Sequence, residues 1–233
     1  MKYAIISDIH SNLEALQKAM SIIDEKKVDE IICLGDVVGY GANPNECVDI
    51  VRSRCSLTVL GNHDAAALDT LLAHDFNAIA RKAVVWTAEH LTEESRAFLL
   101  SLPMVERKED ILFVHSSPDA PEAWDYIIDS DDAVSAIRHF DEQICFIGHT
   151  HVPGIYSRRG RAKSIDRDEQ CIVNVGSIGQ PRDGNPKLAF GIFNSTTWEY
   201  ELIRSEYDIQ KAAEKIYAAK LPEELGNRLM YGM

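Results

Sequence analysis

The sequence predicts a mixed α/β fold in which a parallel part precedes an antiparallel part. Short apolar runs alternate with amphipathic segments over the first 64 residues, which is the pattern of βαβ units. Beyond His151 the pattern changes to short apolar runs separated by turns, which is typical of antiparallel strands. Because no repeat, low-complexity tract or linker divides the 233 residues, we expect a single domain over 1–233.

Two helices are predicted between the first strands. Asn12 can cap a helix over Leu13–Lys27, whose apolar residues recur three or four positions apart. A second helix is expected after Asn43, because Pro44 takes the first helical position and Glu46 lies three residues after the cap.

The segment from Ala65 to about Leu102 breaks the alternation of strand and helix. It is rich in alanine, and helices are expected over 65–73, 77–90 and 93–100. Since the segment follows directly on Asp64, it begins at the rim of any site that precedes it. Two interpretations are open: helices that flank the sheet, or a helical cap-like insertion over a substrate cleft.

The later elements are shorter. A strand is expected at 111–114, followed by a helix over 131–139 that starts at Ser130. Short strands at 154–157, 171–175, 188–193 and 197–202 are expected to form one antiparallel half-sheet. Helices over 207–219 and 223–230 close the chain.

Composition excludes several classes of protein. A net charge of −13 argues against duplex nucleic acid or an anionic membrane as a main partner, since both require a basic face. No apolar run reaches the roughly 18 residues of a membrane-spanning helix, and the N-terminus lacks the pattern of a signal peptide. The five cysteines show no C-x-x-C spacing, which argues against a disulfide framework or a zinc–cysteine site. We expect a cytoplasmic protein.

Candidate metal-binding side chains follow five of the expected strands. They are Asp8 and His10, Asp36, Asn62 with His63 and Asp64, His115, and His149 with His151. If the strands lie parallel in one sheet, these strand ends converge at the edge where such sheets bind ligands. A set of oxygen and nitrogen ligands without thiolate suits divalent metals.

These motifs resemble those of the calcineurin-like metallophosphoesterases: Asp-x-His, Gly-Asp, Gly-Asn-His-Asp, a lone His and Gly-His-x-His, in this order. The resemblance runs from Lys2 to about Asn194 and is strongest to the small stand-alone phosphoesterases of bacteria and archaea. Three further segments carry it, at 35–41, 76–87 and 176–184. The resemblance implies a two-sheet, helix-flanked, four-layer α/β/β/α sandwich.

The resemblance also implies a binuclear centre of two divalent transition metals, with Mn²⁺ as first choice and Fe, Co²⁺, Ni²⁺ or Zn²⁺ as further options. One ion would be bound by Asp8, His10 and His151 and the other by Asn62, His115 and His149. Asp36 would bridge both ions, and His63 would point towards the leaving group.

The residues around His63 leave alternatives open. Asp64 could orient His63 or cap the helix that follows. The phosphoprotein phosphatase branch of the family carries an Asp that pairs with the catalytic His, and Gly39 occupies that position here. This departure weakens a protein phosphatase interpretation.

Four residues are candidates for substrate binding: Ser177 and Arg182 in the Gly-rich segment, and Tyr40 and Arg81 at the rim. The arginine fork of Arg182 could hold a phosphate, or Arg182 could pair with an acidic neighbour in a surface turn.

The expected activity is hydrolysis of phosphodiester or phosphomonoester bonds by a hydroxide that bridges the two metals. A hydrolase of diadenosine polyphosphates or other nucleotides, and a metal-binding scaffold without catalysis, remain alternatives. We expect a small phosphorylated substrate, and a homo-oligomer remains open.

Overall fold

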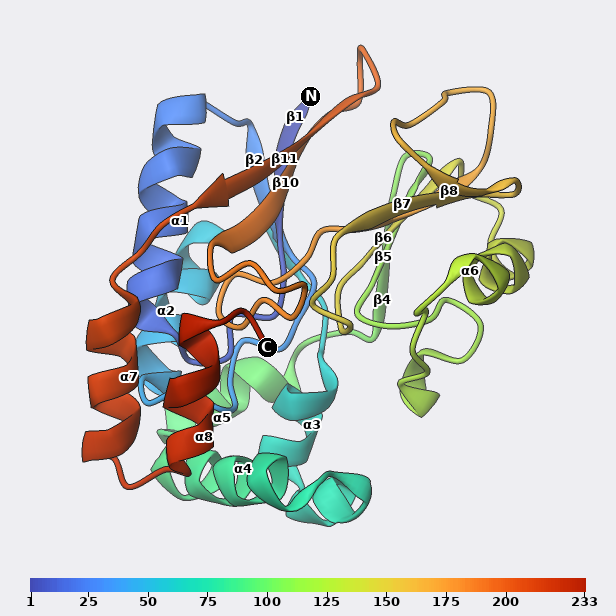
Figure 1. Cartoon of the computed structure of the whole chain (residues 1–233). Coiled ribbons are helices and arrows are strands. Elements are labelled where there is room, and N and C mark those ends of the chain that lie inside the picture. Colours follow the sequence, from blue (N-terminus) through green and yellow to red (C-terminus); the bar gives the residue numbers. More distant parts are fainter.

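A computed structural model describes all 233 residues as two sheets between layers of helices (Figure 1). The first sheet has the order β11 (Glu199–Ser205), β10 (Leu188–Asn194), β1 (Lys2–Ile6), β2 (Glu30–Cys33) and β3 (Leu57–Thr58). The second has the order β4 (Val105–Lys108), β5 (Ile111–Val114), β6 (Ile144–Ile147), β9 (Cys171–Asn174), β7 (Gly154–Ser157) and β8 (Gly160–Ala162).

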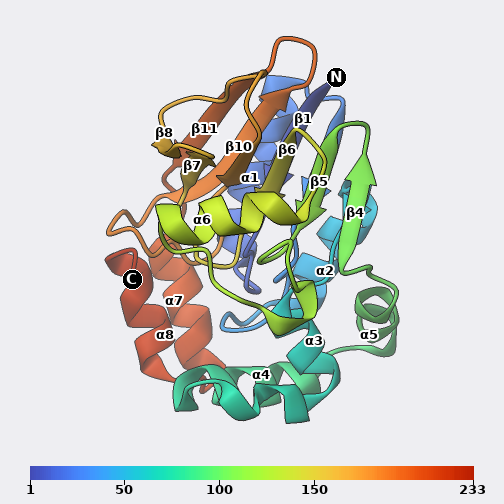
Figure 2. The ribbon, with the colours of Figure 1, turned by 90° about the vertical axis from the view of Figure 1, so that its right-hand side faces the viewer.

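The helices cover both outer faces and one end of the sheets (Figures 1 and 2). The outer face of the first sheet is covered by α1 (Leu13–Lys26) and α2 (Pro44–Arg54), and the second sheet by α6 (Ser130–Ala136) and a 3-10 turn (Ile137–His139). Below the sheets lie α3 (Asn62–Leu68), a 3-10 helix (Thr70–Asp75), α4 (Ala78–His90) and α5 (Glu93–Leu100). The remaining elements are a short 3-10 turn (Pro121–Ala123), α7 (Ile209–Ala218), α8 (Glu223–Asn227) and a last 3-10 turn (Arg228–Met230).

Alternate side chains of the strands fill the spaces between four layers. In β1, Ala4 and Ile6 pack under α1 and α2, whereas Ile5 enters the core between the two sheets. In β6, Phe146 enters that same core and Cys145 packs under α6. Because successive side chains of a strand point to opposite faces, these apolar cores bury both faces of each sheet. The four-layer sandwich is confirmed.

The parallel strands that carry the candidate ligands are divided between the two sheets. Parallel pairing joins β1 to β2 and β3 in the first sheet, and β5 to β6 in the second. The five strands therefore do not lie in a single sheet, which was the condition under which the strand ends were expected to converge. The candidate ligands still converge, because the carboxyl ends of both parallel groups lie at the same end of the sandwich.

The short strands after His151 do not form one antiparallel half-sheet. Strand β9 pairs parallel with β6 and antiparallel with β7 in the second sheet, whereas β10 and β11 extend the first sheet beside β1. Apolar alternation identifies a strand but carries no information on which sheet it joins. Strands β4 and β8 were not predicted, because they are short edge strands with exposed polar residues.

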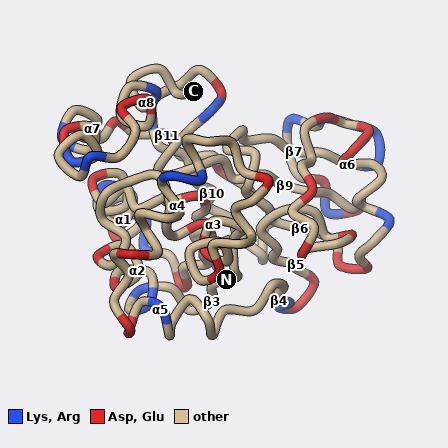
Figure 3. The backbone as a smooth tube through the Cα atoms, turned by 90° about the horizontal axis from the view of Figure 1, so that it is seen from below, with Lys and Arg blue, Asp and Glu red and all other residues tan.

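Basic and acidic residues are interspersed around the periphery of the fold (Figure 3). None of the helices is both long enough and apolar enough to span a membrane.

Candidate metal centre

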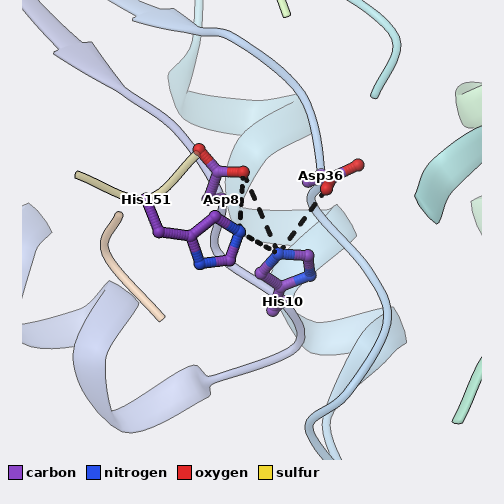
Figure 4. A group of neighbouring side chains, drawn as sticks. All are labelled: Asp8, His10, Asp36 and His151. Carbon is purple, nitrogen blue, oxygen red and sulfur yellow. Dashed lines mark hydrogen bonds and ion pairs between the residues drawn. The ribbon is translucent and has the colours of Figure 1, made fainter. Parts of the chain in front are cut away.

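Two overlapping groups of buried side chains lie where the parallel strands end. Asp8, His10, Asp36 and His151 form one group, shown in Figure 4, and Asp36 also belongs to a second group with His115 and His149. Within each group the possible ligand atoms lie within 4.8 Å of one another. Each group therefore offers a compact set of O and N atoms to one cation, and Asp36 is shared by both.

Individual distances show how tightly the groups are packed. The Nε2 atom of His151 lies 3.2 Å from Oδ1 of Asp8, and the Nε2 atom of His10 lies 3.5 Å from Oδ2 of Asp36. In the second group, Nε2 of His115 lies 3.4 Å from the same Oδ2 of Asp36 and 3.2 Å from Oδ1 of Asn62. The Asn62 amide oxygen thus lies beside the second group.

Left-handed backbone turns aim these side chains. Asp8, His10, Asp36, His149 and His151 have φ angles between 50° and 67°. Such angles are uncommon for residues other than glycine and cost free energy, so they persist where the surrounding structure imposes them. Here they turn side chains from the ends of separate strands towards one point.

Each of the four histidines bonds a backbone carbonyl with one ring nitrogen. The Nδ1 atoms of His10, His115 and His151 lie 3.1, 2.7 and 2.5 Å from the carbonyl oxygens of Val38, Leu34 and Gln180. The Nε2 atom of His149 lies 2.9 Å from the carbonyl oxygen of Trp124. Since a carbonyl only accepts, the ring nitrogen facing it must carry the hydrogen. In neutral rings the opposite nitrogen then presents a lone pair, as metal-binding histidines require.

Electrostatics in this cluster favour a cation. Burial alone would raise the pKa of Asp36, but the positive charge of His115 holds that pKa well below its usual range. Burial alone would lower the pKa of His115, but the carboxylate of Asp36 outweighs it and raises the pKa to about 9. A divalent ion at this place would supply the positive charge that the protonated His115 supplies otherwise. The side chains present therefore fit a divalent metal.

His63 lies at the edge of the cluster, between aromatic rings. Its ring centroid is 4.3 Å from that of Tyr40 and 4.8 Å from that of Phe76, and burial lowers its pKa to about 4. Its Nδ1 atom has no hydrogen-bond partner and faces Gly39, where an added Cβ would lie 2.7 Å from it. The missing side chain at Gly39 therefore makes room for the imidazole.

Asp64 caps the helix rather than orienting His63. Its carboxylate accepts hydrogen bonds from the N–H groups of Gly61, over 3.1 Å, and Val38, over 3.0 Å. Burial and the nearby Asp36 raise the pKa of Asp64 to about 7. Of the two interpretations left open by the sequence, the helix cap is the one that the contacts show.

A cavity of about 370 Å³ adjoins the cluster. Its lining includes Asn62, His63 and His149 from the cluster and Phe76 from the helical segment after Asp64. Its aromatic walls are Tyr40, Phe76, Trp124 and Tyr126. Tyr126 also stacks on His149 with ring centroids 4.1 Å apart. The cavity thus gives a molecule of modest size direct access to the cluster.

The amino-acid pattern of residues 1–197 matches the model of the calcineurin-like phosphoesterase superfamily domain. The chain belongs to this superfamily. It is therefore a phosphoesterase, a hydrolase that acts on phosphoric ester bonds, in a family that uses divalent metals.

Related proteins cover the full length of this phosphoesterase. A protein of Methanocaldococcus jannaschii is 41% identical over 98% of this chain and 97% of its own. The crystal structure of a metallophosphoesterase from Sphaerobacter thermophilus is 37% identical, with a TM-score of 0.90 over 100% of this chain and 99% of its own. A protein of Pyrococcus horikoshii, 21% identical, shares the fold with a TM-score of 0.83 over 100% and 98% of the two chains.

The substrate-binding candidates of this phosphoesterase lie in different settings. Tyr40 lines the cavity, and Arg182 donates from a terminal nitrogen to its hydroxyl, over 3.3 Å, and to Oε1 of Gln180, over 3.1 Å. Arg182 forms no ion pair, so its alternative interpretation as the partner of an acidic neighbour was wrong. Ser177 is fully buried, donates to the carbonyl of Asp8 over 2.8 Å, and accepts from the N–H of Gln180. Its hydroxyl braces the Asp8 turn and is closed to substrate.

Arg81 does not face the cavity. Its guanidinium donates to the carbonyl groups of Ala73, His74 and Phe76, which end the 3-10 helix before α4. Asn77 caps α4 through its amide oxygen. The side chains of both residues are thus bonded to backbone groups.

Trp124, Tyr126 and Arg228 near the site were not expected from the sequence. The two aromatic residues lie in an irregular loop, where no periodicity marks a side chain as inward-facing. Arg228 lies in the last turn of the chain, 34 positions beyond Asn194, where the motif resemblance ends.

Proposed function

We propose that this chain is a binuclear metallophosphoesterase that hydrolyses phosphodiester bonds and, secondarily, phosphomonoesters. The observation that carries the proposal is the sharing of Asp36 between two groups of buried ligand atoms. Two adjacent ions bridged by one carboxylate are a recurrent arrangement for phosphoryl transfer to water. Asp8, His10 and His151 would hold one ion, and Asn62, His115 and His149 the other.

The bound ions would supply an activated water and neutralise phosphate charge. The protein side chains contribute the remaining tasks. His63 would donate a proton to the leaving oxygen, or stabilise its charge, from the cavity side of the cluster. The rings of Tyr40 and Phe76 would hold the imidazole in place, since its Nδ1 atom has no hydrogen-bond partner. Asp64 would act indirectly, by fixing the turn that carries His63.

The helical segment at about 65–102 would act as a partial cap that sets substrate size. Leu72, Asp75, Phe76, Asn77 and Ala80 of this segment line the cavity beside the cluster. An occupant of the cavity would therefore touch both the metal ligands and this segment.

A nucleotide hydrolase is the second candidate, and the aromatic lining of the cavity favours it. Planar bases stack on aromatic rings with a typical gain of ~1–3 kcal/mol per base. Tyr126 is half exposed and Trp124 lines the same wall, so both are accessible to a ring.

A substrate panel tests the proposal. The purified protein would be stripped of metal, loaded with Mn²⁺, Zn²⁺, Co²⁺ or Ni²⁺, and tested on bis-p-nitrophenyl phosphate, p-nitrophenyl phosphate, cyclic nucleotides and diadenosine tetraphosphate. We expect metal-dependent hydrolysis, with the diester preferred over the monoester. Preference for the dinucleotide would favour the second candidate. A protein that binds two ions but hydrolyses none of these esters would overturn the proposal in favour of a metal-binding scaffold.

A further inference from the structure

Two arginine side chains lie beside the metal centre without an acidic partner. Arg182 and Arg228 both donate to the same acceptor, Oε1 of Gln180, over 3.1 and 2.5 Å. Neither forms an ion pair, although the chain carries 37 acidic residues. Gln180 is neutral, so the positive charge of this pair is not compensated.

The arginine pair adjoins the cluster through two residues. The guanidinium carbons of Arg228 and Arg182 lie 4.5 and 5.7 Å from the centroid of the Tyr40 ring. That ring lies 4.3 Å from the ring of His63. Gln180, which accepts from both arginines, also bonds His151 through its backbone carbonyl. A single residue, Tyr40 or Gln180, therefore separates the arginine pair from His63 and His151.

The backbone ties Arg182 more directly to the cluster than Arg228. The N–H of Arg182 donates to the carbonyl of His151 over 3.4 Å. Arg228 contacts the same region through Gln180 and the ring of Tyr40. We therefore expect an extended anion that starts at the cluster to meet Arg182 before Arg228.

The C-terminal segment holds Arg228 firmly in this place. Its neighbour Leu229 is buried in an apolar cluster that contains Tyr40 and residues of α4 and α7. The carbonyl of Gly232 accepts a hydrogen bond from the N–H of Gly184, two residues after Arg182. The Nε atom of Arg228 is buried without a hydrogen-bond partner. The C-terminal segment therefore fixes the guanidinium of Arg228, whose Nε donor has no partner, beside Tyr40.

The two neighbouring positive charges of Arg182 and Arg228 repel each other, and a bound anion would offset this repulsion. Burial lowers the pKa of Arg228, because it disfavours the charged form, and the adjacent Arg182 acts in the same direction. Arginine forks bind phosphate oxygens in a bidentate manner, and such charge-assisted bonds are about twice as strong as neutral ones.

We propose that Arg182 and Arg228 form an anion subsite for a second phosphoryl group of the substrate, next to the phosphate at the metal centre. The inference deepens the proposed function and rests on it, because it assumes that the scissile phosphate lies at the cluster. The substrate class is then a phosphate ester that carries a second, adjacent phosphoryl group, rather than an ester with a single phosphate.

A pair of inhibitors tests the subsite. Inorganic phosphate carries one phosphoryl group, whereas methylenediphosphonate carries two and cannot be hydrolysed. Both would be measured as competitive inhibitors of p-nitrophenyl ester hydrolysis at fixed free metal. For Arg228→Met we expect the inhibition constant of methylenediphosphonate to rise roughly 10- to 100-fold, the range for a lost charged hydrogen bond. The constant for phosphate should change less than about twofold. Chelation by the probe affects both proteins equally and cancels in the ratio of variant to wild type.

Arg167→Met is the matched control, since the Arg167 guanidinium also lies over an aromatic ring, 5.8 Å from the centroid of Trp198, without an acidic partner. It should change neither constant. Arg228→Lys, which keeps the charge and loses the fork, should give an intermediate loss and covers the case in which the Met variant is unstable. An equal loss for both inhibitors, or no loss for either, would overturn the proposal.

Thermal shift of the metal-free protein by methylenediphosphonate gives a second readout without turnover. The shift should be larger for wild type than for Arg228→Met, and an equal shift would count against the subsite. If the wild type bound the diphosphonate but hydrolysed no ester, the proposed function would fail while the subsite stood.

Discussion

The Nε2 atoms of His10 and His151 lie 3.1 Å apart, and both rings carry their hydrogen on Nδ1, towards a backbone carbonyl. In neutral rings, two lone pairs therefore face each other at hydrogen-bond distance with no hydrogen between them. Only a positively charged species near both nitrogens makes this contact favourable. The contact between His10 and His151 is therefore unfavourable without a cation and would become favourable when one binds between the two nitrogens.

Metal removal should lower thermal stability for this reason. A ligand present at about 1,000 times its Kd stabilises the native state by ~4 kcal/mol, which for a chain of this size corresponds to a rise in Tm on the order of 10 °C. We expect chelator-treated protein to melt lower by such an amount and to recover on addition of Mn²⁺ or Zn²⁺. Calorimetry with and without metal measures it. An unchanged Tm would show that the ions, if bound, contribute nothing to folding.

Asp36→Asn should weaken both metal sites. The amide keeps the size of the carboxylate but removes the charge shared by the two groups of ligands. Elemental analysis should find close to two ions per chain in wild type and well below one in this variant. His149→Ala, which touches only the second group, should lose one ion. Asp75→Asn is the control, because that residue is exposed and pairs only with His74. Two retained ions in Asp36→Asn would show that the carboxylate does not bridge.

Gly39→Ala should impair turnover beyond its effect on stability. The φ of Gly39 is 94°, and its added Cβ would push against Nδ1 of His63. A left-handed conformation costs an L-residue about 1–2 kcal/mol, and displacement of a proton donor costs roughly 10²–10⁴-fold in rate. We expect metal content to stay normal while kcat falls strongly, with a smaller loss for substrates whose leaving groups need little protonation.

Gly160→Ala separates strain from displacement. The φ of Gly160 is 99°, but its added Cβ would meet only Ser130 at ordinary contact distance, far from His63 in the second sheet. The two variants should lose similar stability, and only Gly39→Ala should lose turnover. A comparable fall in kcat for both would remove the argument that Gly39 makes room for the imidazole.

The ion pair between Glu30 and Lys108 should make stability depend on pH. It joins β2 of the first sheet to β4 of the second, with the Nζ atom 2.5 Å from Oε1. The hydrogen bond that Lys108 donates to Glu30 lowers the pKa of Glu30 and raises the pKa of Lys108. A depressed carboxyl pKa stabilises the native state above the ordinary value of about 4.3, and this contribution is lost as the pH falls through the native pKa.

Glu30→Gln should therefore melt a few °C lower than wild type at pH 7, the scale of an ion pair worth at most ~1 kcal/mol. The difference should disappear as the pH falls through the lowered native pKa of Glu30, below which Glu30 is protonated in both states. A difference that persists at the lowest pH at which both proteins still fold would assign the loss to the hydrogen bond that Ser56 donates to the same carboxylate.

The ligand positions were predictable because they depend on local rules. A polar residue directly after an apolar run marks a strand end, and parallel strands bring such ends together. What the sequence could not supply was the division of the strands between two sheets, since Ile5 and Phe146 alternate in the same way in either arrangement. Loop residues such as Tyr126, and Arg228 in the last turn of the chain, carry no periodic signal at all.

Arg81 shows a different limit. Its guanidinium donates to carbonyl groups at the end of the preceding 3-10 helix instead of facing the cavity. Such backbone acceptors appear only when the turn geometry is known. An arginine near a cleft is therefore weak evidence for substrate binding until its partners are seen.

The distribution of the ligands over both sheets has a consequence for the order of folding. The backbone N–H of His149 bonds the carboxylate of Asp8, 141 positions earlier in the chain. An ion held by Asp8 and His151 would thus act as a cross-link between the first strand and a strand made late in synthesis. Loop closure of this length costs only ~0.6 kcal/mol more than closure of a loop half as long. An ion at this place would therefore gain its full set of ligands only after the second sheet has docked on the first.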